Sequence, residues 1–116
     1  MNATREAQPI PLVDGLKALA GRYDGLLVDL WGCLHNGVTA YPAAVDALQR
    51  YRAGGGRVVL VSNAPRRNDA VIRQMEGFGV PGDAYDAVMT AGEALRLEID
   101  EASDPWYAAL GDRFHH

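Results

Sequence analysis

The sequence predicts an α/β fold, a three-layer Rossmann-like parallel sheet built from a βαβαβ unit. Three short apolar runs, at 26–30, 58–61 and 85–89, have the length and composition of buried strands. Stretches with apolar residues at helical spacing separate them, from Pro42 to the glycines 54–56 and from about 66 to 76. Strands that alternate with such helices indicate a parallel sheet with right-handed crossovers. We expect helices on both faces and the strand order third, second, first.

Further helices are predicted at both ends of this unit. Apolar spacing over 12–20 predicts a helix that Gly21 ends, and Gly77 with Gly79 ends the helix over 66–76. Thr90 and Glu93 form a capping-box pattern, in which Thr90 bonds the third helical amide and Glu93 reaches back. The helix that follows is expected to reach about residue 99. A short helix is expected over 103–110.

Composition excludes several classes of partner. The chain has 116 residues, enough for one small domain with its own core. A net charge of −4 argues against a nucleic-acid partner. No apolar run approaches the roughly 18 residues of a membrane span, so we predict no membrane partner. Cys33 is the single cysteine, which excludes an intrachain disulfide and favours a reducing, cytoplasmic location.

Polar residues follow the first two predicted strands. Asp29 lies at the end of the first strand, and Ser62 and Asn63 follow the second. A carboxylate is costly to place at the end of a buried strand, and ligands of open α/β sheets bind at that edge. These residues are therefore candidates for a site. From the residues alone, turn and helix-cap roles for them stay open.

Three stretches carry a resemblance to a known family. Residues 29–37, D-L-W-G-C-L-H-N-G, resemble the first motif of the haloacid dehalogenase (HAD) superfamily, D-x-D-G-x-L-x-x-G, in its class IIA sugar- and nitrophenyl-phosphatase-like branch. Residues 59–66, V-L-V-S-N-A-P-R, are similar to that branch's second motif. Residues 85–94, Y-D-A-V-M-T-A-G-E-A, are similar to the stretch ahead of its cap domain. The resemblance covers roughly residues 10–110.

The resemblance implies a magnesium-dependent phosphatase that acts on a small phosphorylated metabolite. Asp29 would be the nucleophile that forms an aspartyl-phosphate. Mg²⁺ would be held by the Asp29 carboxylate and the backbone carbonyl of Trp31. The positive end of the helix after the second strand would face the phosphate. The remaining residues assigned to phosphate or substrate binding are Gly32, Ser62, Asn63 and Arg66.

The sequence departs from the family pattern in three places. Trp31 stands where family phosphatases carry a second aspartate, the general acid, whose loss typically costs about 10²–10⁴-fold in rate. We interpret His35 as a solvated loop residue, with a role as replacement acid as the alternative. Lys17 precedes the nucleophile and cannot supply the family's later lysine, and the family's late acidic pair is not found. Two other functions therefore stay open: a catalytically weak ligand- or protein-binding domain, and a dehalogenase-type hydrolase in which Asp29 attacks carbon.

The resemblance further predicts that the chain is the front half of a larger protein. Residues 1–10 would be a loose segment, 11–102 the N-terminal half of the catalytic core, and 103–116 the start of a linker or cap. An incomplete core of this kind is expected to be inactive alone. It also leaves the strand over 26–30 as an exposed apolar edge, through which we expect homo-oligomers to form.

Overall fold

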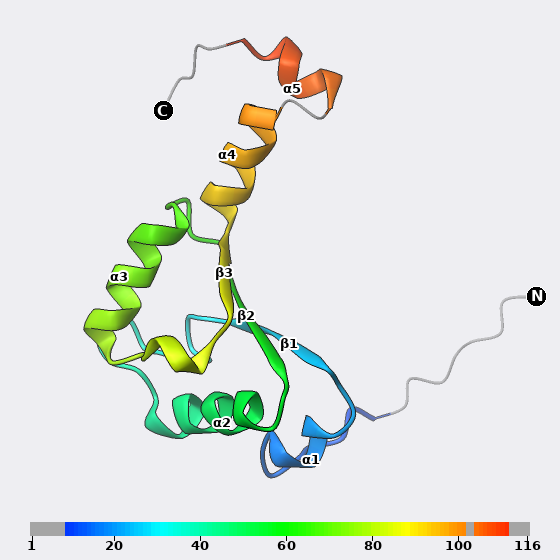
Figure 1. The fold of residues 1–116 in the computed structure, drawn as a ribbon, viewed down its shortest axis with the longest axis vertical. Helices are drawn as coiled ribbons and strands as arrows, with labels where there is room; N and C mark the ends of the chain where they lie inside the picture. Colours follow the sequence, from blue (N-terminus) through cyan, green and yellow to red (C-terminus); the bar gives the residue numbers. More distant parts are fainter. Residues whose placement is uncertain (1–8, 102–103, 112–116) are drawn as a thin grey trace, which may run out of the picture.

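The computed structural model describes residues 9–101 and 104–111, and it contains one parallel sheet (Figure 1). Its strands run in the order β1-β2-β3, with the bounds Gly25–Asp29, Arg57–Ser62 and Ala87–Thr90. Helix α2 (Pro42–Ala53) connects β1 to β2. Helix α3 (Asn68–Phe78) and the 3₁₀ helix η1 (Gly82–Ala84) connect β2 to β3. The predicted α/β class and strand order are confirmed.

The remaining helices lie at the two ends of the described chain. Helix α1 is a single turn, Lys17–Ala20, rather than the predicted helix over 12–20. Leu12 is fully exposed, whereas Leu16 and Ala20 pack against the core, so only the packed turn becomes helical. Helix α4 (Ala91–Glu101) extends away from the sheet, and α5 (Pro105–Ala109) follows it (Figure 1). None of the described helices is long and apolar enough to span a membrane.

One predicted helix end differs from the structure, and the predicted terminal segments lie largely outside the described residues. Gly79 ends α3 in the left-handed conformation, with φ of 91°, but Gly77 lies inside that helix. Most of the segment predicted to be loose, 1–10, lies outside the described residues. The same is true of residues 102–103 and 112–116, around the predicted start of a linker or cap.

The core lies between one face of the sheet and helices α2 and α3. Val58 and Leu60 of β2 are fully buried, and Val88 of β3 is nearly so. The helix residues that complete this buried cluster are Val45, Leu48, Tyr51, Val71 and Met75. The alternation along β2 therefore places every second residue in the core, as expected for a sheet covered on one side.

The opposite face of the sheet is open. Leu27 of β1 is 79% exposed, Val61 of β2 39% and Met89 of β3 37%. Val61 and Met89 are partners in register, and Leu27 lies two residues before the β1 partner of Val61, so the three side chains lie on this face. The expectation of helices on both faces is thus met on one face only. Both crossovers step in the same direction along the sheet, and right-handed crossovers that step the same way lie on the same face. Strand β1 is also an edge strand in the described chain, as predicted.

Candidate active site

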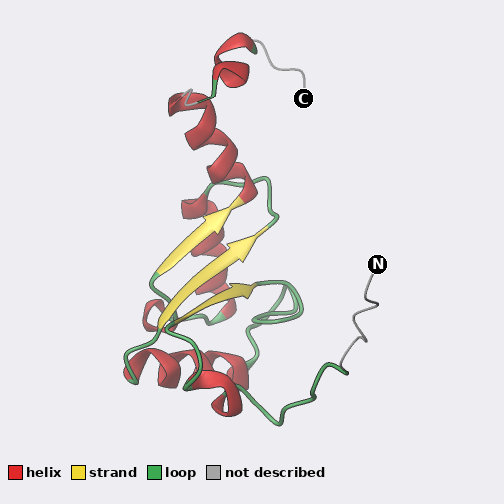
Figure 2. Cartoon of the chain, turned by 90° about the vertical axis from the view of Figure 1, so that its right-hand side faces the viewer, coloured by secondary structure: helices red, strands yellow, loops and turns green. Residues whose placement is uncertain are grey.

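The three strands are parallel and end at the same edge of the sheet (Figure 2). Asp29 is the last residue of β1 and pairs with Val61 of β2. Ser62 is the next residue along β2 and pairs with Thr90, the last residue of β3. The fold therefore brings Asp29 and Ser62 to one edge, although 33 positions separate them in the sequence.

A cleft of about 290 Å³ opens at this edge. Its polar lining comes from three segments: His35 of the loop after β1, Ser62 and Asn63 at the end of β2, and Gln74 of α3. Leu30 and Trp31 also line it, whereas Asp29 does not. Asp29 is exposed, because alternation places its side chain on the open face with its partner Val61, while Ser62 is buried on the other face. Asp29 and Ser62 therefore share one edge of the sheet, with their side chains on different faces of it.

The hydroxyl of Ser62 stabilises a turn and still has a hydrogen to donate. The side chain is buried, and its Oγ accepts a hydrogen bond from the backbone N–H of Ala64 at 3.1 Å. A hydroxyl that accepts one bond can still donate its own hydrogen. The turn role and the predicted binding role are thus compatible in this residue.

Arg66 lies in the loop before α3 and is exposed. Its guanidinium pairs with no carboxylate among the described residues, whereas neighbouring Arg67 pairs with Glu93. Arg66 is therefore a cation that a ligand at this edge can recruit.

Gly32 has a structural role in the loop after β1. Its φ is +75°, and its N–H donates to the carbonyl of His35 at 2.9 Å. Because that amide is already paired, the geometry favours a turn role over the predicted phosphate contact. The carbonyl of Trp31 accepts no backbone hydrogen bond among the described residues, which leaves it available to a ligand.

The indole of Trp31 lies over Gly37. A Cβ built on Gly37, which has φ of +86°, would lie 2.2 Å from the indole ring. Trp31 itself is 66% exposed. Its ring therefore packs against the tip of the loop, and an indole has no acidic proton to give.

His35 is buried, so its interpretation as a solvated loop residue is wrong. Only 4% of it is exposed, and its ring contacts those of Trp31 and Phe78, with centroids 5.5 and 5.0 Å away. The backbone N–H groups of residues 33–35 all donate to the carbonyl of Leu30, which folds the loop back into the protein. Burial lowers the pKa of His35, and the charge of Asp29 opposes this shift.

Only one of the two hydrogen bonds of the predicted capping box forms at the start of α4. Thr90 Oγ1 accepts from the N–H of Glu93 at 3.0 Å. Glu93 does not reach back, because the N–H of Thr90 donates to Oδ1 of Asn68 at 3.0 Å. The Glu93 carboxylate instead accepts from the N–H of Asn68, the first residue of α3, at 3.2 Å. It thus occupies the positive end of α3, which the sequence analysis assigned to the phosphate.

The loop that carries Asn63 and Arg66 is fastened to the start of α4. Gly92 N–H donates to the carbonyl of Ala64 at 3.1 Å, and the Thr90 hydroxyl donates to that of Arg66 at 2.5 Å. A Cβ on Gly92 would lie 2.5 Å from the carbonyl of Pro65. The close approach of two backbones therefore requires glycine at position 92 and fixes the loop.

Acid is expected to weaken the contacts that the Glu93 carboxylate of α4 makes with Arg67 and Asn68. The Arg96 guanidinium, followed by the Asn68 N–H, holds the pKa of Glu93 below its ordinary value. A depressed folded pKa gives stability that is complete above the ordinary value of 4.5 and is lost as the pH falls through the folded pKa. We expect Glu93→Gln to unfold at a lower temperature than the wild type at pH 7, with the difference shrinking towards pH 3. Thermal unfolding at a series of pH values measures it, and a constant difference would contradict the assignment.

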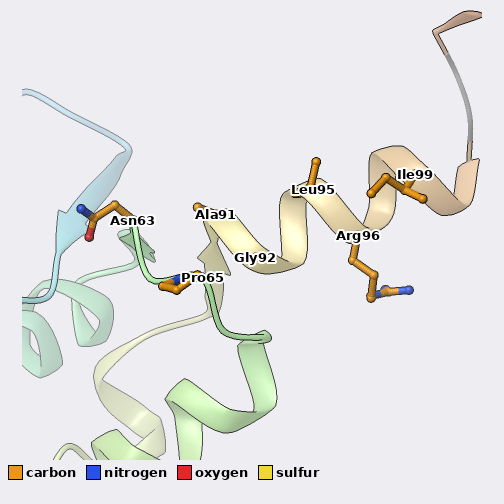
Figure 3. Close-up of a pocket in the computed structure, with 7 residues that line it drawn as sticks. All are labelled: Asn63, Pro65, Ala91, Gly92, Leu95, Arg96 and Ile99. Carbon is orange, nitrogen blue, oxygen red and sulfur yellow. The ribbon is translucent and has the colours of Figure 1, made fainter. Parts of the chain in front are cut away.

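A larger hollow of about 500 Å³ lies beside the cleft (Figure 3). Asn63 and Pro65 of the loop form one side, and Leu95 and Ile99 of α4 extend along the other. Its one charged residue, Arg96, is paired with Glu93 and Asp100. This hollow is therefore apolar and does not suit a phosphate, whereas the smaller cleft has the donors that a phosphate requires.

The family comparison agrees with the fold. A model of the haloacid dehalogenase-like hydrolases matches residues 26–116. The match covers more than half of the chain and includes Asp29, the loop after it and the loop after β2. The chain belongs to the haloacid dehalogenase-like hydrolase family.

One solved structure gives a closer comparison. It is a hydrolase of the haloacid dehalogenase-like family from Brucella suis 1330, with 44% sequence identity and a TM-score of 0.73. The match covers 77% of this chain and 33% of that one, so the chain aligns with about a third of its relative. No curated protein matches.

Proposed function

We propose that the chain supplies the nucleophile and the phosphate-binding loop of a magnesium-dependent phosphatase that acts on a small phosphorylated metabolite. The supporting observation is that Asp29 and the donor-rich cleft beside Ser62 occupy the same edge of the sheet. Family membership supports the coarser class, a hydrolase. The cytoplasm is the proposed location.

In the proposed reaction, the Asp29 carboxylate is the nucleophile that attacks phosphorus. Its Oδ1 accepts the N–H of Leu30 at 2.9 Å, which orients the carboxylate, and its other oxygen accepts no hydrogen bond from the residues that the structure describes. In the proposed reaction this oxygen forms a bond to phosphorus while the bond to the ester oxygen breaks. Water then releases phosphate from the aspartyl-phosphate. Ser62 and Asn63 would donate hydrogen bonds to the phosphoryl oxygens.

Trp31 supports a second candidate function. An indole cannot protonate a leaving group, so a member of the family with Trp31 at this position can serve as a catalytically weak domain that binds a phosphorylated ligand or a protein. Attack of Asp29 on carbon, the dehalogenase alternative, requires no metal. Dependence on magnesium and release of phosphate distinguish the phosphatase from both.

The donors at this edge fit Mg²⁺ only in part. The Asp29 carboxylate and the Trp31 carbonyl are two oxygen ligands of the kind that Mg²⁺ prefers, and when bound it would neutralise phosphoryl charge. No group of three metal-ligating side chains comes together in the described residues. The other positions of an octahedral site would be left to water or to ligands outside the described residues.

The 116-residue chain is therefore expected to bind Mg²⁺ weakly, in the millimolar range or above, because one carboxylate and one carbonyl leave most of the octahedron to water. Isothermal titration calorimetry measures this affinity. Asp29→Asn, which keeps the size of the side chain, is the control for binding at this edge. Micromolar affinity that depends on Asp29 would show that the chain holds a complete site.

The proposed function can be tested in a chimera in which the matched part of this chain replaces the corresponding third of the Brucella suis protein. We expect the chimera to release phosphate from p-nitrophenyl phosphate with Mg²⁺ and to lose this activity with a chelator. A folded chimera that releases no phosphate would reject the phosphatase. Phosphate release unchanged by the chelator would reject the role of the metal.

A further inference from the structure

His35 is a buried side chain that keeps one unused hydrogen-bond donor. Its Nδ1 accepts the N–H of Gly37 at 3.0 Å. An imidazole nitrogen that accepts a hydrogen bond carries no proton, so the proton of the neutral ring is on Nε2. Nε2 has no hydrogen-bond partner in the part of the chain that the structure describes.

The unused donor faces the cleft beside Ser62. Among the described residues, no fully buried side-chain nitrogen or oxygen lacks a partner. Because Nε2 lacks one, it is not fully buried and belongs to the 4% of His35 that is exposed. His35 lines the cleft together with Ser62 and Asn63. Because His35 lines this cleft and its Nε2–H is partly exposed, we infer that this group is the donor that His35 offers to a ligand there.

The ring is held in place before any ligand arrives. The rings of Trp31 and Phe78 pack against it, and its backbone N–H donates to the carbonyl of Leu30 at 3.2 Å. A donor that is already oriented loses little conformational freedom on binding. The cleft lining contains no aspartate or glutamate, so its donors suit an oxyanion.

We propose that His35 is a phosphate-binding residue, which donates a hydrogen bond from Nε2 to a phosphoryl oxygen held beside Ser62. This inference rests on the proposed function, because it adds a ligand to the same phosphate site. The role requires a neutral imidazole and no proton transfer. It gives the loop after β1 a direct contact with substrate through His35.

Two substitutions separate the donor from the structural role of the ring. In His35→Asn, the amide oxygen replaces Nδ1 as the acceptor for Gly37, but the side chain ends short of Nε2. In His35→Gln, the amide nitrogen reaches the position of Nε2 and restores a donor. A hydrogen bond to a charged group typically changes affinity by about tenfold or more.

The experiment is a titration of the ¹⁵N-labelled chain with inorganic phosphate, followed by NMR at the amides of Ser62 and Asn63 and at His35 Nε2. We expect phosphate to shift all three signals, His35→Asn to weaken binding about tenfold, and His35→Gln to stay within about threefold of the wild type. The His35 Nε2 signal tests the contact in the wild type, without any variant.

The outcomes distinguish this inference from the proposed function. If phosphate shifts Ser62 and Asn63 but leaves Nε2 unmoved, and His35→Asn binds like the wild type, the role of His35 is rejected while the phosphate site stands. If none of these signals moves, the phosphate site is rejected, and the role of His35 is rejected with it.

Discussion

Replacing Asp29 by asparagine is expected to lower the turnover of the chimera by at least about 10³-fold, because the amide cannot form the covalent intermediate. The substitution keeps the shape of the side chain, and Asp29 is exposed, so the fold should be unaffected. Initial rates of phosphate release from p-nitrophenyl phosphate measure the effect. Asp24→Asn, an exposed aspartate just before β1, is the control and should retain full activity.

The 116-residue chain alone is expected to show no turnover above its own Asp29→Asn variant. It keeps Asp29, the proposed nucleophile, but Trp31 stands where the resemblance places a general acid, and Lys17 precedes β1 in the sequence. Phosphoryl transfer depends on positioning and charge stabilisation, so the loss of a cation and an acid should each cost orders of magnitude. Turnover that depends on Asp29 in the chain alone would contradict this expectation.

The second large effect is expected in assembly. Leu27 on the open face is 79% exposed, and β1 has a free edge, so we expect the chain to form dimers or larger species. Leu27→Lys should raise the dissociation constant of a dimer by at least about 10²-fold, since each copy loses one buried leucine worth roughly 1.5–3 kcal/mol. Sedimentation velocity over a series of concentrations measures the association.

Leu12→Lys is the matched control for assembly, because Leu12 is equally apolar and fully exposed but lies outside the sheet. It should leave the association unchanged. A wild-type chain that remains monomeric at every concentration would show that the open face is not an interface. Equal effects of the two substitutions would show that the association is unspecific.

The strands and their order could be predicted because apolar runs and intervening helices determine them almost alone. Val58 and Leu60 are apolar, and they are buried as expected. The open face could not be predicted from Leu27 or Val61, because the same residue types serve in a covered face. Its exposure follows from the strand order, because two right-handed crossovers that step the same way lie on one face; the predicted order therefore already implied one uncovered face.

The candidate site was predictable at its strand ends and less so in its loops. Asp29 and Ser62 follow apolar runs, so their common edge follows from a parallel sheet. The burial of His35 depends on the hydrogen bonds that fold its loop onto Leu30, and no local pattern reveals them. Glu93 likewise fits a local capping box, but its carboxylate accepts from the backbone N–H of Asn68, and the side-chain Oδ1 of Asn68 accepts from the Thr90 N–H that Glu93 would have bound.

The most direct test of the central claim is detection of a phosphoryl group on Asp29. The chimera is mixed with p-nitrophenyl phosphate and Mg²⁺, quenched in acid and reduced with borohydride, which converts an aspartyl-phosphate to homoserine. Tandem mass spectrometry then reads the residue at position 29. We predict homoserine at position 29, and its absence from the Asp29→Asn variant. Turnover that leaves Asp29 unmodified, or a phosphoryl group on another residue such as His35, would contradict the account.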